Sequence, residues 1–147
     1  MHITFIEREI NMTAQDIMKR MGVKQSVIRM TIYNYLFENR THPTAEEIYN
    51  ALSPDMPTLS KTTVYNTVNL LAENGIINPI SIEGTRIRYD VNNDFHAHFL
   101  CNECKKIFDV MDVSCPNCTL DGFTVKTENV FYSGCCKECA DKKNKFN

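Results

Sequence analysis

The chain has 147 residues, with 18 acidic and 16 basic side chains, a net charge of −2 and 43% hydrophobic residues. This length suits one domain or two small ones, and the nearly neutral charge excludes a protein that binds nucleic acid through a globally basic surface, although a local basic helix remains compatible with it. No apolar run approaches the length that crosses a membrane, so we expect no membrane partner.

The N-terminal part predicts a series of helices. Thr13 followed by Asp16 is typical of a capping box, which would begin a short helix that ends at Gly22. A second helix is predicted from about residue 25 to residue 39, because apolar and small side chains recur there at helical spacing. The stripe that we expect this helix to bury consists of Ile28, Thr31, Ile32, Tyr35 and Leu36.

Two more helices follow in the sequence. Thr44 and Glu47 form another capping-box pattern, so a third helix is expected to begin near Thr44. Ser60 is a good N-cap for a fourth helix over residues 61–74, which Gly75 would end.

The fourth helix has two different faces. Val64, Val68 and Leu71 predict its buried stripe. The opposite face carries hydrogen-bonding side chains: Lys61, Thr62, Tyr65, Asn66 and Asn69. Side chains of this kind read base edges and phosphates in a major groove, which makes them candidate DNA contacts. The simpler alternative is an ordinary solvated face.

Residues 80–82 and 85–89 alternate apolar and polar side chains around a Glu-Gly turn, which predicts a β-hairpin. Helices followed by such a hairpin predict a winged helix-turn-helix. Arg86 and Arg88 lie two residues apart, so they would share one face of the strand and could meet the phosphate backbone. They could equally be solvated strand charges.

The cysteines predict a thiolate metal site. Three pairs have two-residue gaps and one cysteine is left over: Cys101 and Cys104, Cys115 and Cys118, Cys136 and Cys139, and Cys135. Two such pairs supply the four ligands of tetrahedral Zn²⁺, and spacing alone does not decide which two share the ion. Disulfides in an exported protein are the alternative. The odd cysteine count and the N-terminus, which lacks a charged and then apolar leader, favour a cytoplasmic protein instead.

A second cluster has a different chemistry. His96 and His98 are two residues apart, so on a strand both would point to one face, and two carboxylates, Asp90 and Asp109, flank them in the sequence. Imidazole and carboxylate ligands suit iron or manganese, which favours a metal site over two surface histidines. The opposite face of the strand would then carry core residues: Phe95, Ala97 and Phe99.

Together these residues resemble the ferric uptake regulator family. The motifs follow one another in that family's order and spacing: His42-Pro-Thr-Ala-Glu-Glu-Ile-Tyr49, Thr62-Thr-Val-Tyr65-Asn66, Arg88-Tyr89-Asp90, His96-x-His98-x-x-Cys101-x-x-Cys104 and Cys136-x-x-Cys139. The resemblance extends from about residue 13 to residue 142 and is strongest to the peroxide-sensing repressors of the family.

The resemblance implies an α+β fold. A winged-helix DNA-binding domain would occupy residues 1–90, with residues 1–12 as an N-terminal extension. A small α/β dimerisation domain with a zinc site of four cysteines would occupy residues 91–147. The resemblance also implies a homodimeric transcription repressor whose partner is double-stranded, palindromic operator DNA.

The family pattern further assigns the ligands. Structural Zn²⁺ would be held by Cys101, Cys104, Cys136 and Cys139. Regulatory Fe²⁺ or Mn²⁺ would be held by His42, Asp90, His96, His98 and Asp109. The peroxide-sensing branch is favoured by Asp109, because iron-sensing members usually carry Glu at that position.

The implied mechanism is a metal clamp. A metal that binds His42 together with the C-terminal ligands would hold the two domains in an orientation that fits the operator. In the presence of Fe²⁺, hydrogen peroxide would add an oxygen to His42 or His96, open the clamp and end repression, whereas Mn²⁺ would hold the clamp without this reaction. Because such a protein consumes itself in sensing, we do not expect an enzyme.

The chain departs from the family at two places. Ser26-Val-Ile-Arg29 stands where relatives usually carry Thr-Pro-Gln-Arg. The Cys115-Pro-Asn-Cys118 knuckle stands in a region where relatives carry a helix. With Cys135 it could bind a second zinc, form a redox-active pair, compete for the structural zinc, or be a turn with two free thiols.

Two other functions remain open. One is a repressor of the same family that regulates iron or zinc uptake and responds to metal rather than to peroxide. The more remote one is a rubredoxin-like electron carrier built on the cysteine pairs.

Overall fold

The computed structural model describes residues 12–84, 86–111, 113, 121–124 and 128–144, and it separates into two compact units, Met1–Asp94 and Phe95–Asn147. The division lies four residues beyond the predicted division at residue 90. Within the described ranges no helix has the length and apolar character that crossing a membrane requires.

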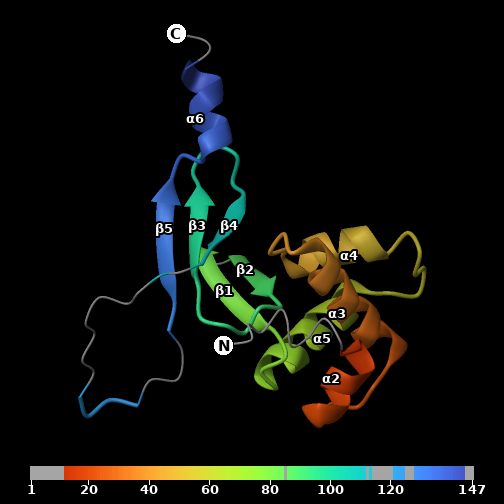
Figure 1. The fold of residues 1–147 in the computed structure, drawn as a ribbon. Helices are drawn as coiled ribbons and strands as arrows, with labels where there is room; N and C mark the ends of the chain where they lie inside the picture. The colour runs from red at the N-terminus through yellow and green to blue at the C-terminus, as the bar shows by residue number, and fades with distance from the viewer. Residues whose placement is uncertain (1–11, 85, 112, 114–120, 125–127, 145–147) are drawn as a thin grey trace. The chain divides into compact units, whose positions relative to one another are not determined.

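The N-terminal unit is helical and ends in a hairpin (Figure 1). Its described elements are α2 (Ala14–Arg20), α3 (Val27–Asn39), α4 (Ala45–Leu52), α5 (Lys61–Glu73), β1 (Asn78–Glu83) and β2 (Arg86–Asp90). Strands β1 and β2 pair antiparallel, with Asn78 opposite Asp90 and Ile80 opposite Arg88. This arrangement confirms the predicted winged helix-turn-helix.

The helix starts follow from the caps that the sequence predicts. The capping box of Thr13 and Asp16 and that of Thr44 and Glu47 are both formed in full. Ser60 accepts a hydrogen bond from the backbone N–H of Thr63 and begins α5 as predicted. The second predicted helix begins at residue 27 rather than near residue 25, because the Ser26 side chain caps it.

One hydrophobic core holds the N-terminal unit together. Its fully buried side chains come from α2, α3, α4 and α5 and include Met18, Ile32, Leu36, Ile48, Val64, Val68 and Leu71. The stripe predicted for the second helix was incomplete, because Tyr33 is also buried whereas Thr31 and Tyr35 are only partly covered. Helix α3 contacts both α2 and α5, so it buries a broader face than a single stripe.

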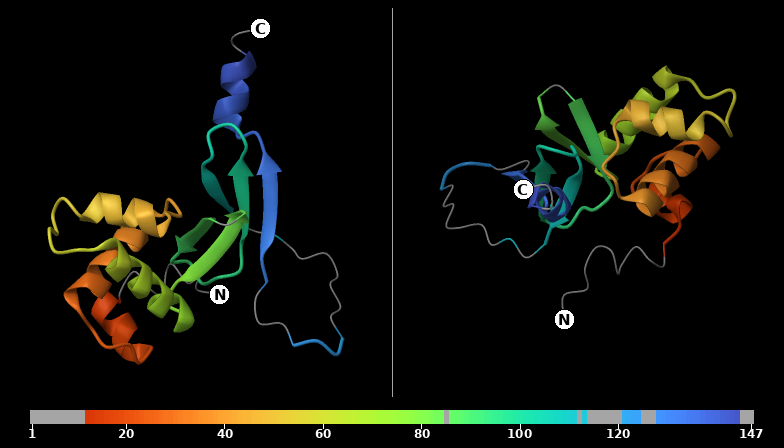
Figure 2. Two further views of the ribbon diagram at one scale, coloured as in Figure 1. Left: turned by 180° about the vertical axis from the view of Figure 1, so that it is seen from behind. Right: turned by 90° about the horizontal axis from the view of Figure 1, so that it is seen from above.

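The C-terminal unit combines a small sheet with a helix (Figure 2). Its described elements are β3 (Ala97–Cys101), β4 (Ile107–Val110), β5 (Val130–Gly134) and α6 (Lys137–Asn144). Strand β3 is central in the described sheet, antiparallel to β4 and parallel to β5. With the N-terminal unit, this confirms the predicted α+β class.

The predicted strand around the histidines needs one correction. Strand β3 begins at Ala97, so Phe95 precedes it and is 45% exposed instead of lying in a core. Ala97 is buried as expected and Phe99 is half-buried. Both faces of β3 are covered, so alternation along this strand does not separate core from surface.

Candidate metal sites and nucleic-acid interface

The first and third cysteine pairs meet in the C-terminal unit. Cys101 ends β3, Cys104 lies in the turn that follows, and Cys136 and Cys139 lie at the start of α6. Their four sulfur atoms lie within 4.8 Å of one another. Four thiols this close, offered by two turns, fit the tetrahedral coordination of Zn²⁺.

Backbone hydrogen bonds build this cluster. Lys105 adopts the left-handed conformation, with φ at 60°, and its N–H donates to the Cys101 carbonyl oxygen, which closes the turn between the first two cysteines. The N–H of Asn102 donates to the carbonyl oxygen of Gly134, which ties this turn to the end of β5. The N–H of Cys136 donates to the sulfur of Cys101, so both halves of the cluster are fixed by the main chain.

The thiols differ in how readily they ionise. The backbone N–H groups of Cys104 and Cys136 lower the pKa of Cys101 to about 6. The pKa of Cys139 is raised to about 12, first by its hydrogen bond to Cys136 and then by burial. The Cys101 thiol therefore ionises more readily than the Cys139 thiol, and a bound cation would favour the thiolate form of both.

The remaining thiols stand apart from this cluster. Cys135 is exposed, and its thiol approaches the carbonyl oxygen of Cys136 at 3.6 Å. Cys115 and Cys118 lie outside the described residues, so the roles considered for that knuckle stay predictions.

His96, His98 and Asp109 meet elsewhere in the C-terminal unit. The Oδ1 atom of Asp109 lies 3.4 Å from Nε2 of His96 and 3.7 Å from Nε2 of His98. The two imidazole rings lie 4.5 Å apart between centroids, and both are buried. The register of β3 and β4 sets this geometry, since His98 is directly opposite Asp109. Two imidazoles and a carboxylate that converge in this way suit a borderline cation such as Fe²⁺ or Mn²⁺.

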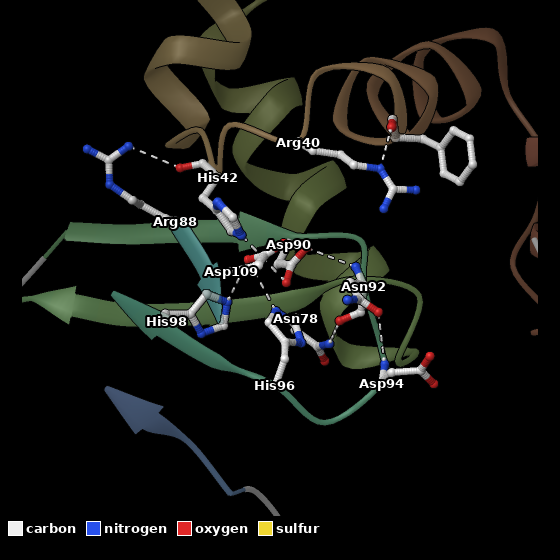
Figure 3. A network of polar contacts seen from close by, with 11 residues as sticks. Arg40, His42, Asn78, Arg88, Asp90, Asn92, Asp94, His96, His98 and Asp109 are labelled. Atoms are coloured by element: carbon white, nitrogen blue, oxygen red, sulfur yellow. Dashed lines mark hydrogen bonds and ion pairs between the residues drawn. The ribbon is translucent and has the colours of Figure 1, made fainter. Parts of the chain in front are cut away.

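His42 and Asp90 form a pair within the N-terminal unit. Nε2 of His42 lies 3.7 Å from Oδ2 of Asp90, and both side chains are almost fully buried. Asp90 ends β2 and also accepts a hydrogen bond from the N–H of Asn92 (Figure 3). A buried imidazole beside a buried carboxylate offers one nitrogen and one oxygen ligand from a rigid setting.

The backbone at His42 is strained. Its φ is 51°, in the left-handed region that non-glycine residues seldom occupy, at a cost of about 1–3 kcal/mol. The loop is held by Tyr89, whose N–H donates to the carbonyl oxygen of Pro43 at 3.0 Å. Strand β2 therefore fixes the direction in which the His42 side chain leaves the chain.

The predicted DNA-reading face of α5 is open. All five residues are exposed: Lys61, Thr62, Tyr65, Asn66 and Asn69. Tyr65 is 47% exposed, which is high for an aromatic side chain on a helix that packs in a core. Together with Asn69 and Arg86 it lines a groove of about 500 Å³ between α4, α5 and β2. Lys61 is engaged by Glu46, with Nζ 2.7 Å from Oε1.

Comparison with known proteins identifies the family. The sequence model of the ferric uptake regulator family matches residues 20–130 of this chain. The chain belongs to the ferric uptake regulator family.

Curated relatives of this regulator include peroxide-responsive repressors. The peroxide-responsive repressor PerR of Staphylococcus aureus (strain USA300) is 34% identical over 145 residues, which cover 95% of this chain and 97% of that protein.

Solved structures share the fold. The ferric uptake regulator Fur of Helicobacter pylori, described as having three functional metal binding sites, is 20% identical and superimposes with a TM-score of 0.66 over 95% of this chain and 97% of its own. PerR from Streptococcus pyogenes, described in a study of peroxide sensing and gene regulation, is 26% identical, with a TM-score of 0.50 over 87% of this chain and 94% of its own.

Membership in the ferric uptake regulator family settles the class of function. The chain is a DNA-binding and metal-binding transcription regulator and not an enzyme. The winged helix has no place in a rubredoxin-like electron carrier, so the family assignment argues against that alternative.

In this regulator the side chain of Arg88 has hydrogen-bond partners within the N-terminal unit. Its side chain is 12% exposed, and it donates hydrogen bonds to the carbonyl oxygen of His42 and to Glu47. Arg86 is exposed, and a phosphate contact from either arginine stays a prediction. The hydrogen bond between Arg88 and Glu47 could not be predicted from the sequence, because the two residues are 41 positions apart. The sequence assigned Glu47 only to the capping box of its own helix.

Proposed function

We propose that this regulator is a peroxide-sensing repressor that binds palindromic operator DNA as a homodimer. The observation that carries the proposal is the convergence of His96 and His98 on one oxygen of Asp109, at 3.4 and 3.7 Å. The 34% identity to the Staphylococcus aureus PerR over 95% of the chain supports the same branch.

In this proposal Cys101, Cys104, Cys136 and Cys139 hold structural Zn²⁺. The support is the mutual approach of their sulfur atoms to within 4.8 Å. The ion would join the end of β3 to the start of α6, because each of these elements supplies one cysteine pair. A unit this small buries few large side chains, so a metal crosslink of this kind supplies much of its folding free energy.

We further propose that His42, Asp90, His96, His98 and Asp109 share one regulatory ion, Fe²⁺ or Mn²⁺. The N-terminal pair offers two ligands and the C-terminal group offers three, and neither number alone satisfies an octahedral cation. Asp90 and His96 stand only six residues apart on either side of the division between the units. Six residues span at most roughly 20 Å, which allows both groups to reach one ion.

Sharing the ion would make the relative orientation of the two units depend on metal. Metal binding favours the one orientation in which all ligands reach, and the winged helices of a dimer then have the spacing that a palindromic operator requires. Losing a ligand would weaken this preference. By linkage, metal would raise the affinity for DNA by the same factor by which DNA raises the affinity for metal.

The peroxide response would depend on the histidines themselves. Fe²⁺ held by these residues would supply the redox chemistry that cleaves hydrogen peroxide, so that one peroxide oxygen would be added to an imidazole carbon and the other would leave as water. Mn²⁺ would not supply this chemistry. His42 and His96 are buried, so their imidazole rings would be shielded from bulk water and would stand next to the ion that they hold. A histidine that has gained an oxygen would be a poor ligand, and losing either His42 or His96 would weaken the shared ion's hold on both units.

The experiment is a DNA-binding assay with two metals. A palindromic duplex is first selected in vitro with the Mn²⁺-loaded, zinc-containing protein. The protein is then loaded anaerobically with Fe²⁺ or Mn²⁺, treated with equimolar hydrogen peroxide and titrated against the labelled duplex by fluorescence anisotropy. We expect the Fe²⁺ sample alone to lose binding, and fresh Mn²⁺ not to restore it.

Other outcomes would redirect the proposal. DNA binding that follows the metal concentration and ignores peroxide would make the protein a metal-dose regulator of the same family. Binding that is lost with either metal and recovered with a thiol reductant would indicate a thiol switch.

A further inference from the structure

Arg88 joins three parts of the N-terminal unit. It lies in β2, opposite Ile80 of β1. Its Nη1 donates to the carbonyl oxygen of His42 at 3.0 Å and to Oε2 of Glu47 at 3.2 Å (Figure 3 shows the first contact). The guanidinium thus binds both the loop that carries His42 and the first turn of α4.

Further bonds tie this loop to β2. The N–H of Tyr89 donates to the carbonyl oxygen of Pro43, and Thr44 forms a β-bridge with Arg88. Oε2 of Glu47, which accepts the hydrogen bond from Arg88, also accepts one from the N–H of Thr44 at 2.7 Å. This second hydrogen bond is part of the cap of α4. Residues 42–44 are therefore attached to β2 by main-chain and side-chain bonds together.

The attachment matters because His42 is in the left-handed conformation, with φ at 51°. A relaxed φ at this residue would turn its carbonyl oxygen away from Arg88 and swing the imidazole to a new direction. The hydrogen bond from Arg88 opposes that relaxation, since it is made only when the carbonyl oxygen points toward β2.

We infer that Arg88 is a positioning residue for metal binding, which holds His42 in the conformation that presents its imidazole to the regulatory ion. This inference rests on the proposed role of His42 as a ligand. A consequence is that the wing and the metal site are linked through β2: Arg86, exposed on the same strand, is available to DNA, while Arg88 connects the strand to His42. By reciprocity, wing contacts that stabilise β2 strengthen metal binding, and metal binding stabilises the wing.

The test measures Mn²⁺ affinity in the zinc-containing, full-length protein by isothermal titration calorimetry. Substitution of a residue that orients a metal ligand typically lowers metal affinity by about 10–100-fold. Arg88→Ala should therefore weaken Mn²⁺ binding by about tenfold or more. The matched control is Arg86→Ala, which removes the same charge from the same strand and should leave affinity unchanged. Arg88→Lys keeps a donor and the charge, so it should recover part of the loss and serves as the second variant if Arg88→Ala folds poorly.

A double-mutant cycle separates positioning from a general structural effect. In a His42→Ala background, Arg88→Ala should weaken Mn²⁺ binding no further, because the side chain that it positions is absent. In the metal-free protein, Arg88→Ala should also speed amide hydrogen exchange at His42 and Thr44, the two residues of this segment that carry a backbone N–H.

Three results would overturn the inference. The first is a His42→Ala variant that binds Mn²⁺ weakly while Arg88→Ala binds normally. The second is an equal loss from Arg88→Ala with and without His42, which would reveal a structural role. If His42→Ala itself binds Mn²⁺ normally, the proposed ligand fails, and this inference fails with it.

Discussion

His98 and Asp109 lie directly opposite each other in the antiparallel pair of β3 and β4, with Nε2 of the histidine 3.7 Å from Oδ1 of the carboxylate. Both main chains are fixed by the ladder, so the distance is set by strand register rather than by a loop. A one-residue slip of β4 would turn Asp109 to the other face of the sheet and dismantle the group.

The first prediction concerns this carboxylate. Asp109→Asn keeps the size of the side chain but removes the negative charge that two imidazoles face, so Mn²⁺ affinity should fall by more than about tenfold. Calorimetry on the zinc-containing protein measures the change. Asp121→Asn, an exposed position in the same unit, is the control and should bind Mn²⁺ like the unaltered protein. Equal affinity in the two variants would remove Asp109 from the proposed site.

The second prediction concerns zinc. Cys101→Ser should lose the tightly bound zinc, and the C-terminal unit should unfold, because structural zinc sites contribute on the order of 10 kcal/mol to folding. Cys135→Ser alters a cysteine that is exposed and outside the cluster, so zinc content and thermal unfolding should be unchanged. Metal analysis and circular dichroism measure both. A stable, zinc-containing Cys101→Ser protein would place the zinc on other thiols.

The third prediction concerns Tyr65. If its exposed side chain contacts a base, Tyr65→Ala should weaken binding to the selected palindrome by ~1–3 kcal/mol and leave binding to random DNA nearly unchanged. Anisotropy titrations against both duplexes make the comparison. A similar loss on both would indicate packing or a phosphate contact rather than base reading.

The fourth prediction concerns Lys61, whose pKa is raised, chiefly by its hydrogen bond to Glu46. If Lys61 binds a DNA phosphate, it must give up or share its ion pair with Glu46. Glu46→Gln removes the charge that competes with the phosphate, so it should tighten DNA binding. Lys61→Met should reduce the slope of log affinity against log salt by about one. Glu46→Gln should give little further gain in the Lys61→Met background. A full gain there would mean that Glu46 acts by general repulsion of DNA.

Local signals in the sequence predicted much of the fold. The two capping boxes, the Ser60 cap and the hairpin each depend on residues close in the chain, and each is formed as expected. The alternation of apolar and polar side chains does not carry over to burial along β2, where Ile87 is exposed and Arg88 is largely covered. The two-residue gap within each cysteine pair indicated that both thiols of a pair could reach one ion, whereas the choice of the first and third pairs came from the family resemblance and not from spacing.

Features set by distant contacts were harder to predict. Phe95 was expected in a core, but β3 starts two residues later and leaves it exposed. Tyr33 is buried because α3 packs against both α2 and α5. A prediction that assigns one buried stripe to a helix does not include a second buried face. The bond between Arg88 and Glu47 joins residues 41 positions apart, and neither residue type indicates it.

The central claim is that peroxide is sensed through oxidation of the histidine ligands, and peptide mass spectrometry tests it most directly. The zinc-containing protein is loaded anaerobically with Fe²⁺, or with Mn²⁺ as a control, treated with equimolar hydrogen peroxide and digested. We predict one added oxygen on the peptide that carries His42 or His96, with Fe²⁺ only. Unmodified histidines in the Fe²⁺ sample would contradict the account, and oxidised Cys115 and Cys118 in their place would move the sensing chemistry to the thiols.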